Sequence, residues 1–392
     1  MSVEYTKSVS IYGGHIYAAT GVSAVLRELK DGEWHEYNVE HSVLSFDSEI
    51  SNTEVAVKYT LRKKLLSKFR VKIWEWAEKS SLIAEYYFKY SNLFRVKTML
   101  TKHFVFDSDT CYIIHDVWTL LQFKRLGYSL TNVIFVIHGS LTPTQVLVTV
   151  FPSLCNSKFI EDLNFELKGI MSEIKSLIAL SELSRRNFSY EFGARSVTIS
   201  NGISPLNTLR ENHSNDMSVH CAGTVCLRKR QYLIFEIVDL LGVDFIRNNN
   251  ISFHIYGDGP LLEHLKDKAS AYKGYGVNFY GNMKEPFTRY SKGDIILSLS
   301  TEEGLPIALL EGLRAGCVPI VTNVGACNEV VESNGYLINA TLESDVVREF
   351  SNALSEVVKY NKTLSENSIN LFNSKFSSKA MLKKYAEEIK RR

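Results

Sequence analysis

Short apolar runs rich in β-branched residues alternate with longer amphipathic stretches along almost the whole chain, and this alternation limits the possible fold. The short runs have the length and composition of buried strands, whereas stretches such as TQVLVTVFPSL, QYLIFEIVDLL and PLLEHLKDKA have helical spacing. Strands separated by helices form right-handed crossovers, so the pattern predicts an α/β protein with doubly wound parallel sheets. The strand-like runs are SVSIY, CYIIHD, VIFVIHG, SLIALS and SVTIS in the first half, and SVHCAGT, ISFHIYG, VNFYG, DIILSLS and VPIVTN in the second.

The alternating pattern runs twice and is interrupted by the polar, turn-forming residues 199–218. At roughly 100–200 residues per domain, 392 residues suffice for two. We therefore predict one Rossmann-like domain over residues 1–203 and another over 204–375, with a C-terminal helix over 376–392 that packs back on the first. Ligands of such sheets bind beyond the carboxyl ends of the strands, which predicts a site in a cleft between the two domains.

The composition excludes several classes of function. A net charge of +2 is too small to indicate a nucleic-acid partner, and no apolar run approaches the roughly 18 residues needed to span a bilayer. The N-terminus has no basic head followed by an apolar run, so we expect no signal peptide. Six scattered cysteines without a C-x-x-C pair are typical of reduced core residues, and they favour a cytoplasmic protein.

The stretch TEEGLPIALLEGLRAG, which spans residues 301–316, follows a strand-like run and carries two widely spaced glutamates. Pro306 suits the first turn of a helix that ends at Gly316. The start of this helix offers free N–H groups and partial positive charge to an anion such as phosphate. Glu303 precedes that start, and Glu311 leans back toward it, so both could accept hydrogen bonds from sugar hydroxyls. The alternative is that Glu303 only complements the helix dipole and that Glu311 is a solvated charge.

A second stretch, AGTVCLRKRQ, lies between a strand-like run and a helix-like run. Its three consecutive cations, Arg228, Lys229 and Arg230, would place positive charge at the carboxyl ends of the strands, where lysine and arginine can bind phosphate. A solvated basic turn remains the alternative.

Several weaker signals also lie beside strand-like runs. The glycines of IYGGHIYAATG and IYGDGP allow backbone or ligand to approach closely, although a plain tight turn fits the second stretch as well. His115 and His138 end two runs and could donate to a hydroxyl or a phosphate. Asp107 and Asp109 could hold a divalent ion, but they precede a strand and so lie at the wrong end of the sheet.

Together these motifs resemble glycosyltransferase family 4, the retaining nucleotide-sugar transferases of GT-B fold, which have two Rossmann-like domains. The resemblance is carried by EGLPIALLE, which is similar to the family's pair of glutamates separated by seven residues, and by GLRAGCVPIVTNVGACNEVV after it. ISNGIS, IYGDGP, LSELSRRNF, NFYGN and KFSSKAMLKKY support it, in the family's order over nearly the whole chain.

The resemblance implies roles for individual residues. Glu303 would contact hydroxyls of the donor sugar, Glu311 would hold the ribose, and Lys229 would bind the diphosphate. His138 would lie by the transferring sugar, so Glu303, His138 and Lys229 form the predicted catalytic set. The predicted donor-binding set is Gly14, Thr224, Arg228, Lys229, Gly257, Asn282, Met283, Glu303, Gly304, Leu305, Pro306, Ile307 and Glu311.

One position departs from the family. The family often has arginine directly after the glycine of AGT, and this chain has Thr224, for which Arg228 could compensate.

The reaction implied by the resemblance is transfer of a sugar from a UDP- or GDP-sugar to a hydroxyl of a glycan or lipid-linked glycan, with retained anomeric configuration and no metal or other cofactor. Bacterial surface-polysaccharide assembly is the pathway that the resemblance suggests. A GT-B UDP-sugar epimerase and a non-catalytic nucleotide-sugar-binding partner subunit remain alternatives.

Residues 55–72, VAVKYTLRKKLLSKFRVK, carry seven cations and no acidic residue, with apolar residues at near-helical spacing. Such a segment could lie on an anionic membrane, and a core-facing helix with a solvated basic side fits as well. The resemblance favours the membrane, because many members of the family extend lipid-linked glycans at the inner leaflet, so we predict a peripheral contact with the inner face of the cytoplasmic membrane through Lys58–Lys72.

Overall fold

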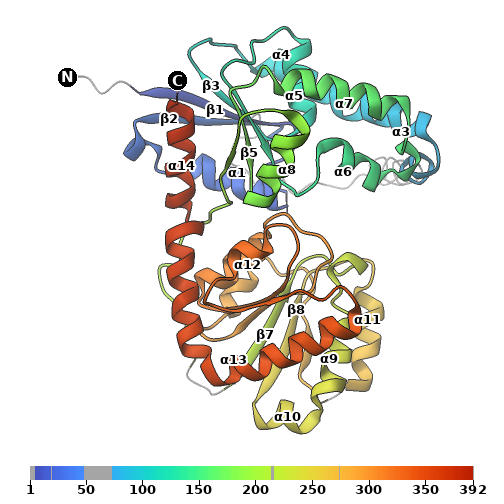
Figure 1. The fold of residues 1–392 in the computed structure, drawn as a ribbon, viewed down its shortest axis with the longest axis vertical. Helices are drawn as coiled ribbons and strands as arrows, with labels where there is room; N and C mark the ends of the chain where they lie inside the picture. Colours follow the sequence, from blue (N-terminus) through green and yellow to red (C-terminus); the bar gives the residue numbers. More distant parts are fainter. Residues whose placement is uncertain (1–4, 19, 48–72, 213–215, 273, 392) are drawn as a thin grey trace. The chain divides into compact units, whose positions relative to one another are not determined.

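The chain forms two compact α/β units, each built on a six-stranded parallel sheet (Figure 1). The computed structural model describes residues 5–18, 20–47, 73–212, 216–272 and 274–391. One unit comprises residues 1–199 with 382–392, and the other comprises residues 200–381. The division falls four residues before the predicted boundary, and the chain rejoins the first unit at Leu382 rather than at residue 376.

The sheet of the N-terminal unit has the strand order β2-β1-β3-β4-β5-β6. The strand order changes direction between β1 and β3, which makes this pair the switch point of the sheet. Its strands are β1 (Thr6–Tyr12), β2 (Val39–Ser45), β3 (Cys111–Ile114), β4 (Val133–Ile137), β5 (Ser176–Ala179) and β6 (Ser196–Thr198).

Several helices of this unit begin where the sequence supplies a side-chain cap. Thr20, Asp116 and Ser181 each accept a hydrogen bond from a backbone N–H in the first turn of the helix that follows, and Thr142 forms a capping box with Gln145. The helices are α1 (Gly21–Asp31), α3 (Ser81–Tyr87), α4 (Phe94–His103), α5 (Val117–Arg125), α6 (Pro143–Val150), α7 (Lys158–Met171) and α8 (Glu182–Phe192).

The sheet of the C-terminal unit has the order β12-β11-β10-β7-β8-β9, and its switch point lies between β7 and β10. Its strands are β7 (Met217–Ala222), β8 (Ile251–Tyr256), β9 (Val277–Phe279), β10 (Ile295–Ser298), β11 (Val318–Thr322) and β12 (Tyr336–Ile338). Its helices are α9 (Leu233–Leu241), α10 (Val243–Asn248), α11 (Leu262–Ala269), α12 (Ile307–Arg314) and α13 (Glu343–Leu371).

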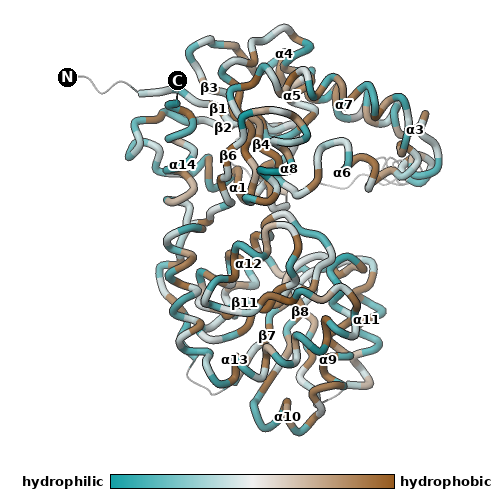
Figure 2. Tube along the Cα trace, in the orientation of Figure 1, coloured by the Kyte–Doolittle hydropathy of each residue, from teal (hydrophilic) through white to brown (hydrophobic). Residues whose placement is uncertain are grey.

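The central strands are buried on both faces, which explains their continuous apolar sequences. Every residue of β3, β4, β5, β10 and β11 is buried, and Figure 2 shows the hydrophobic colour on strands such as β4 and β11. All ten predicted strands are present. The prediction missed β2 and β12, two edge strands of which the first has no continuous apolar run and the second has only three residues.

The last helix, α14 (Ser378–Lys390), joins the N-terminal unit from Leu382 onward. Arg195 forms a bidentate ion pair with Glu388, and the Lys175 Nζ donates to the Ile389 carbonyl at 2.8 Å. Gly32 lies so close to this helix that a Cβ would come within 2.7 Å of Leu382. The C-terminal end of the chain therefore packs on the first unit.

Candidate functional site

The predicted donor residues lie mostly at the carboxyl ends of the strands on either side of the switch point of the C-terminal sheet. Lys229 belongs to the loop after β7, and Glu303 belongs to the loop after β10, and these two strands are neighbours. Adjacent parallel strands whose following helices diverge leave a crevice at their carboxyl ends, where α/β proteins bind ligands.

Backbone carbonyls join these two loops to each other. The Thr301 N–H donates to the Arg228 carbonyl at 2.9 Å, and the Arg228 guanidinium donates to the Glu302 carbonyl at 2.5 Å. Arg230, which was predicted to add charge to the site, is buried with a left-handed φ of 52°, and its Nε donates to the Leu299 carbonyl at 2.6 Å. The prediction for Arg230 is wrong, because its charge fixes the loops together and does not face a ligand.

Glu303 lies against the other two cations of that stretch. Its side chain forms an ion pair with the Lys229 ammonium, and Arg228 lies 3.4 Å from the same carboxylate oxygen. Glu303 is only 8% exposed, so its charge depends on these partners. The alternative that Glu303 only complements a helix dipole does not account for these contacts. Lysine and carboxylate here form a set that can bind an anion and hydroxyl groups at one place.

A glycine after β11 supports the backbone of Glu303. Gly325 has a φ of 55°, and a Cβ at this position would lie 1.7 Å from the Glu303 carbonyl oxygen. The next residue, Ala326, donates its N–H to the Gly304 carbonyl at 2.9 Å. Gly325 lies within the motif GLRAGCVPIVTNVGACNEVV, but no local pattern indicates its role, since its partner is more than 20 residues away in the chain.

Helix α12 begins beside this loop, as predicted. Pro306 is its N-cap residue with a φ of −65°, no side chain caps its first turn, and Gly316 ends it with a φ of 80°. Leu305 is buried, and its carbonyl accepts from the Asn201 side chain at 3.4 Å. The amides of Ile307 and its neighbours therefore start a fixed helix whose positive end follows Glu303 directly.

Glu311 is half-buried on α12, which excludes the alternative of a fully solvated charge. Burial raises the pKa of Glu311 to about 7, and Arg314 opposes this shift. The pKa of Tyr290 is raised well above its ordinary range, mainly by burial and further by the nearby charge of Glu311. A carboxyl with such a pKa changes its charge near neutral pH, so its ability to accept from hydroxyl groups depends on pH.

The remaining predicted donor residues continue along the same edge of the sheet, at the ends of β8 and β9. Gly257 has a φ of 133°, and a Cβ there would lie 2.0 Å from the Gly223 carbonyl oxygen, so close backbone packing accounts for this glycine. Its N–H donates to the Gly281 carbonyl at 2.7 Å. The next two residues, Asn282 and Met283, follow β9, the first exposed and the second half-buried. Thr224 is exposed, and its carbonyl accepts from Gln231 at 3.0 Å.

Gly14 and His138 belong to the N-terminal unit and lie at the carboxyl edge of its sheet. A Cβ at Gly14 would lie 2.5 Å from the Tyr12 ring, so a larger residue here would require that ring to move. The Nε2 of His138 lies 2.9 Å from the Nδ1 of His115, and burial lowers the pKa of His138 to about 4. Both histidines are therefore neutral near pH 7, and desolvation lowers the pKa of His115 as well.

Asp116 is a buried carboxylate at the same edge that the sequence analysis passed over. It accepts from the Gly13 N–H at 2.6 Å and from the Thr119 hydroxyl at 2.7 Å, and burial raises its pKa. Its position directly after His115 in CYIIHD and ahead of a helix could have identified it as a helix cap.

The described residues contain no group of three or more His, Cys, Asp or Glu side chains that could hold a metal ion. Asp107 instead forms a turn before β3, where its carboxylate accepts from the Asp109 N–H and the Thr110 hydroxyl. No helix in the described part of the chain is long and apolar enough to cross a membrane. Lys58–Lys72, the predicted membrane contact, lie outside the described residues.

Comparison with known proteins gives a family match over the same part of the chain. Residues 218–359, a little over a third of the chain, match the family model described as glycosyl transferases group 1. An O-antigen biosynthesis glycosyltransferase of Escherichia coli, WbnH, is 29% identical over 150 residues, which are 38% of this chain and 41% of WbnH. A capsular polysaccharide biosynthesis glycosyltransferase of Staphylococcus aureus, CapH, is 22% identical over 57% of this chain and 63% of CapH.

The chain thus spans about two fifths to two thirds of the length of these relatives. Solved structures extend the similarity to both units. The lipopolysaccharide outer core galactosyltransferase WaaB has a TM-score of 0.61 at 15% identity over 98% of this chain and 99% of WaaB. HepE of Anabaena, solved in complex with UDP, has a TM-score of 0.60 at 14% identity over 97% and 98%. The predicted GT-B fold with two Rossmann-like domains is therefore confirmed.

Proposed function

We propose that this chain is a retaining, metal-independent glycosyltransferase. It transfers a sugar from a nucleoside-diphosphate sugar to a hydroxyl of a glycan or lipid-linked glycan during the synthesis of a bacterial surface polysaccharide. The observation that carries the proposal is the buried Glu303 paired with Lys229 at the switch point of the C-terminal sheet. This pair offers a cation to a diphosphate and a carboxylate to sugar hydroxyls at adjacent positions.

Donor binding exchanges the partners of this pair. The diphosphate replaces Glu303 as the partner of Lys229, and the released carboxylate oxygens accept from hydroxyls of the donor sugar. Arg228, which is half-exposed beside the pair, turns to the same diphosphate and takes the place of the arginine that the family often has at the position of Thr224. Glu311 accepts from the ribose in its ionised form, and the backbone near Asn282 contacts the base.

The transition state separates charge, and the residues at the site stabilise both signs. The leaving diphosphate gains negative charge, which Lys229, Arg228 and the first amides of α12 stabilise without rearrangement. The sugar becomes cation-like, and the carboxylate of Glu303 lies on its side of the broken bond. Exclusion of water during transfer prevents hydrolysis of the donor.

In the N-terminal unit, Gly14 would bring its loop to the donor phosphates, and His138 would contact the transferring sugar. Because the pKa of His138 is about 4, it acts as a neutral hydrogen-bonding group and not as a cation. His115 holds its ring in place through the 2.9 Å contact.

The relatives support the pathway and the first donor to test. They are named for O-antigen and capsular polysaccharide biosynthesis, and one structural neighbour was solved with UDP. We extend the proposal to a cytoplasmic location with a peripheral membrane contact through Lys58–Lys72. Sedimentation with anionic vesicles tests the contact, and binding that is insensitive to salt contradicts its electrostatic basis.

The experiment that tests the function begins with thermal shifts over UDP, GDP and their common sugar conjugates, since a ligand of the folded state raises its melting temperature. The best donor is then incubated with glycan acceptors, and products are identified by mass and by the anomeric NMR coupling. Glu303→Ala should bind the nucleotide and give no transfer, and turnover should persist in a metal chelator. Normal transfer by Glu303→Ala would refute the site, and a changed sugar nucleotide without acceptor would indicate the epimerase.

A further inference from the structure

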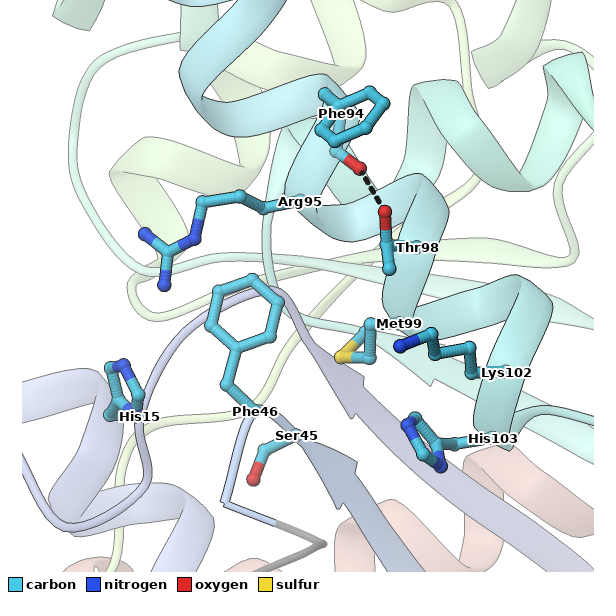
Figure 3. Close-up of a pocket in the computed structure, with 9 residues that line it drawn as sticks. All are labelled: His15, Ser45, Phe46, Phe94, Arg95, Thr98, Met99, Lys102 and His103. Atoms are coloured by element: carbon cyan, nitrogen blue, oxygen red, sulfur yellow. Dashed lines mark hydrogen bonds between the residues drawn. The ribbon is translucent and has the colours of Figure 1, made fainter.

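The N-terminal unit contains a pocket of about 390 Å³ that none of the roles above uses (Figure 3). It lies at the carboxyl ends of β1 and β2, since His15 follows β1 by three residues and Ser45 ends β2. Helix α4 forms the other wall. The lining residues are His15, Ser45, Phe46, Phe94, Arg95, Thr98, Met99, Lys102 and His103.

The wall formed by α4 combines charge with apolar surface by helical spacing. Arg95, Met99 and Lys102 follow one another at intervals of four and three residues, so they share one face of the helix. Figure 3 shows Met99 between the two cations, with Phe46 facing them from the opposite side. This face of α4 thus presents two cationic side chains, Arg95 and Lys102, on either side of the apolar Met99.

The pocket has an excess of positive charge. None of the nine described residues that line it is acidic, and neither Arg95 nor Lys102 forms an ion pair with any residue that the structure describes. The nearby Asp47 does not line the pocket; it is buried, and its carboxylate lies 2.7 Å from the Nδ1 of His15. The Arg95 guanidinium lies over the Phe46 ring, 4.6 Å from its centroid, so the ring holds the cation in place without neutralising it.

We propose that this pocket binds an oxyanion on the acceptor, with Arg95 and Lys102 contacting the anion and Phe46, Phe94 and Met99 contacting the less polar body that carries it. The inference rests on the proposed function, since it names the class of acceptor: an anionic one, either a lipid phosphate or an acidic sugar. Both sources present the same charge beside apolar surface.

The pocket is separate from the residue proposed to contact the transferring sugar. It lies at the end of β2, and His138 follows β4, three strand spacings away in the same sheet. At about 4.8 Å per spacing, the ends of these two strands lie about 14 Å apart. The anion that we assign to the pocket therefore belongs to another part of the acceptor than the hydroxyl that is glycosylated.

Two pairs of small molecules test whether the pocket binds an oxyanion. Within each pair, one member carries an anionic group and the other is neutral. Phenyl β-D-glucuronide is compared with phenyl β-D-glucoside, and geranyl phosphate with geraniol, by calorimetric titration of the full chain without donor. We expect the charged member of at least one pair to bind about tenfold more tightly than its neutral partner, as for one charge-assisted hydrogen bond. The pair that discriminates identifies the source of the anion. Equal binding within both pairs overturns the proposal.

The double variant Arg95→Gln, Lys102→Gln should abolish the preference for the charged probe. Lys97→Gln, a change of an exposed lysine on the same helix outside the pocket, should keep it. Unchanged preference in the double variant overturns the assignment. Both variants should keep the wild-type thermal shift with UDP, so failure of the donor site and failure of this pocket are read from separate signals.

Discussion

Glu303→Gln should lower the free energy of unfolding of the free protein and, at the same time, increase its affinity for nucleotide. In the free protein the carboxylate is the ion-pair partner of Lys229, whose side chain is only 15% exposed. Glutamine keeps the shape of the side chain but leaves the ammonium without a counter-charge. A bound diphosphate supplies the missing negative charge, so the penalty disappears in the complex.

The size of the effect follows from the burial of the pair. Loss of one partner costs about 3–5 kcal/mol in a fully buried pair and about 0–1 kcal/mol at the surface. Lys229 is mostly buried, but the half-exposed Arg228 also approaches Glu303, so we expect an intermediate loss of about 2 kcal/mol. For a unit that spans residues 200–381, this corresponds to a fall of about 4–8 °C in melting temperature.

The assay compares melting temperatures of wild type and Glu303→Gln with and without UDP. The variant should melt lower alone and show the larger rise with saturating UDP. It should also bind UDP about thirtyfold more tightly by titration, because about 2 kcal/mol of ion-pair energy no longer opposes binding. Sugar transfer should nevertheless be lost. Glu302→Gln is the matched control, since its backbone carbonyl and not its side chain contacts Arg228, and it should leave both values unchanged.

The competition between Glu303 and the diphosphate is refuted if Glu303→Gln melts like wild type and binds UDP less tightly. Such a result would mean that the carboxylate supports nucleotide binding directly, and that the ion pair contributes nothing in the free protein.

Three further predictions concern neighbouring residues. Lys229→Ala should raise the donor KM about tenfold to a hundredfold in initial-rate assays, since it removes charge-assisted bonds to the diphosphate, and an unchanged KM would contradict its role. Gly325→Ala should abolish transfer and lower the melting temperature, because its Cβ would collide with the Glu303 carbonyl, whereas Gly127→Ala, with a φ of 82° and open space around it, should cost only about 1 kcal/mol in denaturant unfolding. The pKa of Glu311 lies near 7 against an ordinary 4.5, so between these pH values the folded state binds one more proton than the unfolded state, and the free energy of unfolding should fall as pH rises. Glu311→Gln should remove this pH dependence of stability. In the wild type, UDP affinity should fall below about pH 7, and the variant should lose this dependence as well.

The sequence predicted the strands because burial on both faces leaves a continuous apolar run, as in β4 and β10. It missed β2 because VEHSVLS has exposed positions and carries no such run. It also located α12 from Pro306 and Gly316, since these residues fix a helix start and a helix end through their own backbone geometry.

The sequence predicted a set of candidate donor residues, but it could not predict their arrangement. Arg228, Lys229 and Arg230 are equivalent by position in the sequence, yet Arg230 is buried on a carbonyl and Lys229 pairs with Glu303. Which cation turns inward depends on the backbone angle at Arg230 and on a loop about 70 residues later in the chain. The role of Gly325 depends in the same way on a distant carbonyl.

The amino-acid sequence alone determined the two parallel sheets, the start of α12 and the chemical types of the residues proposed to bind the donor, because each of these follows from local pattern and composition. Only the tertiary structure decided that β7 and β10 are neighbours, that Glu303 is buried against Lys229, and that α4 brings Arg95 and Lys102 to the end of β2. Contacts between segments far apart in the chain depend on strand order and loop packing, which no local pattern encodes.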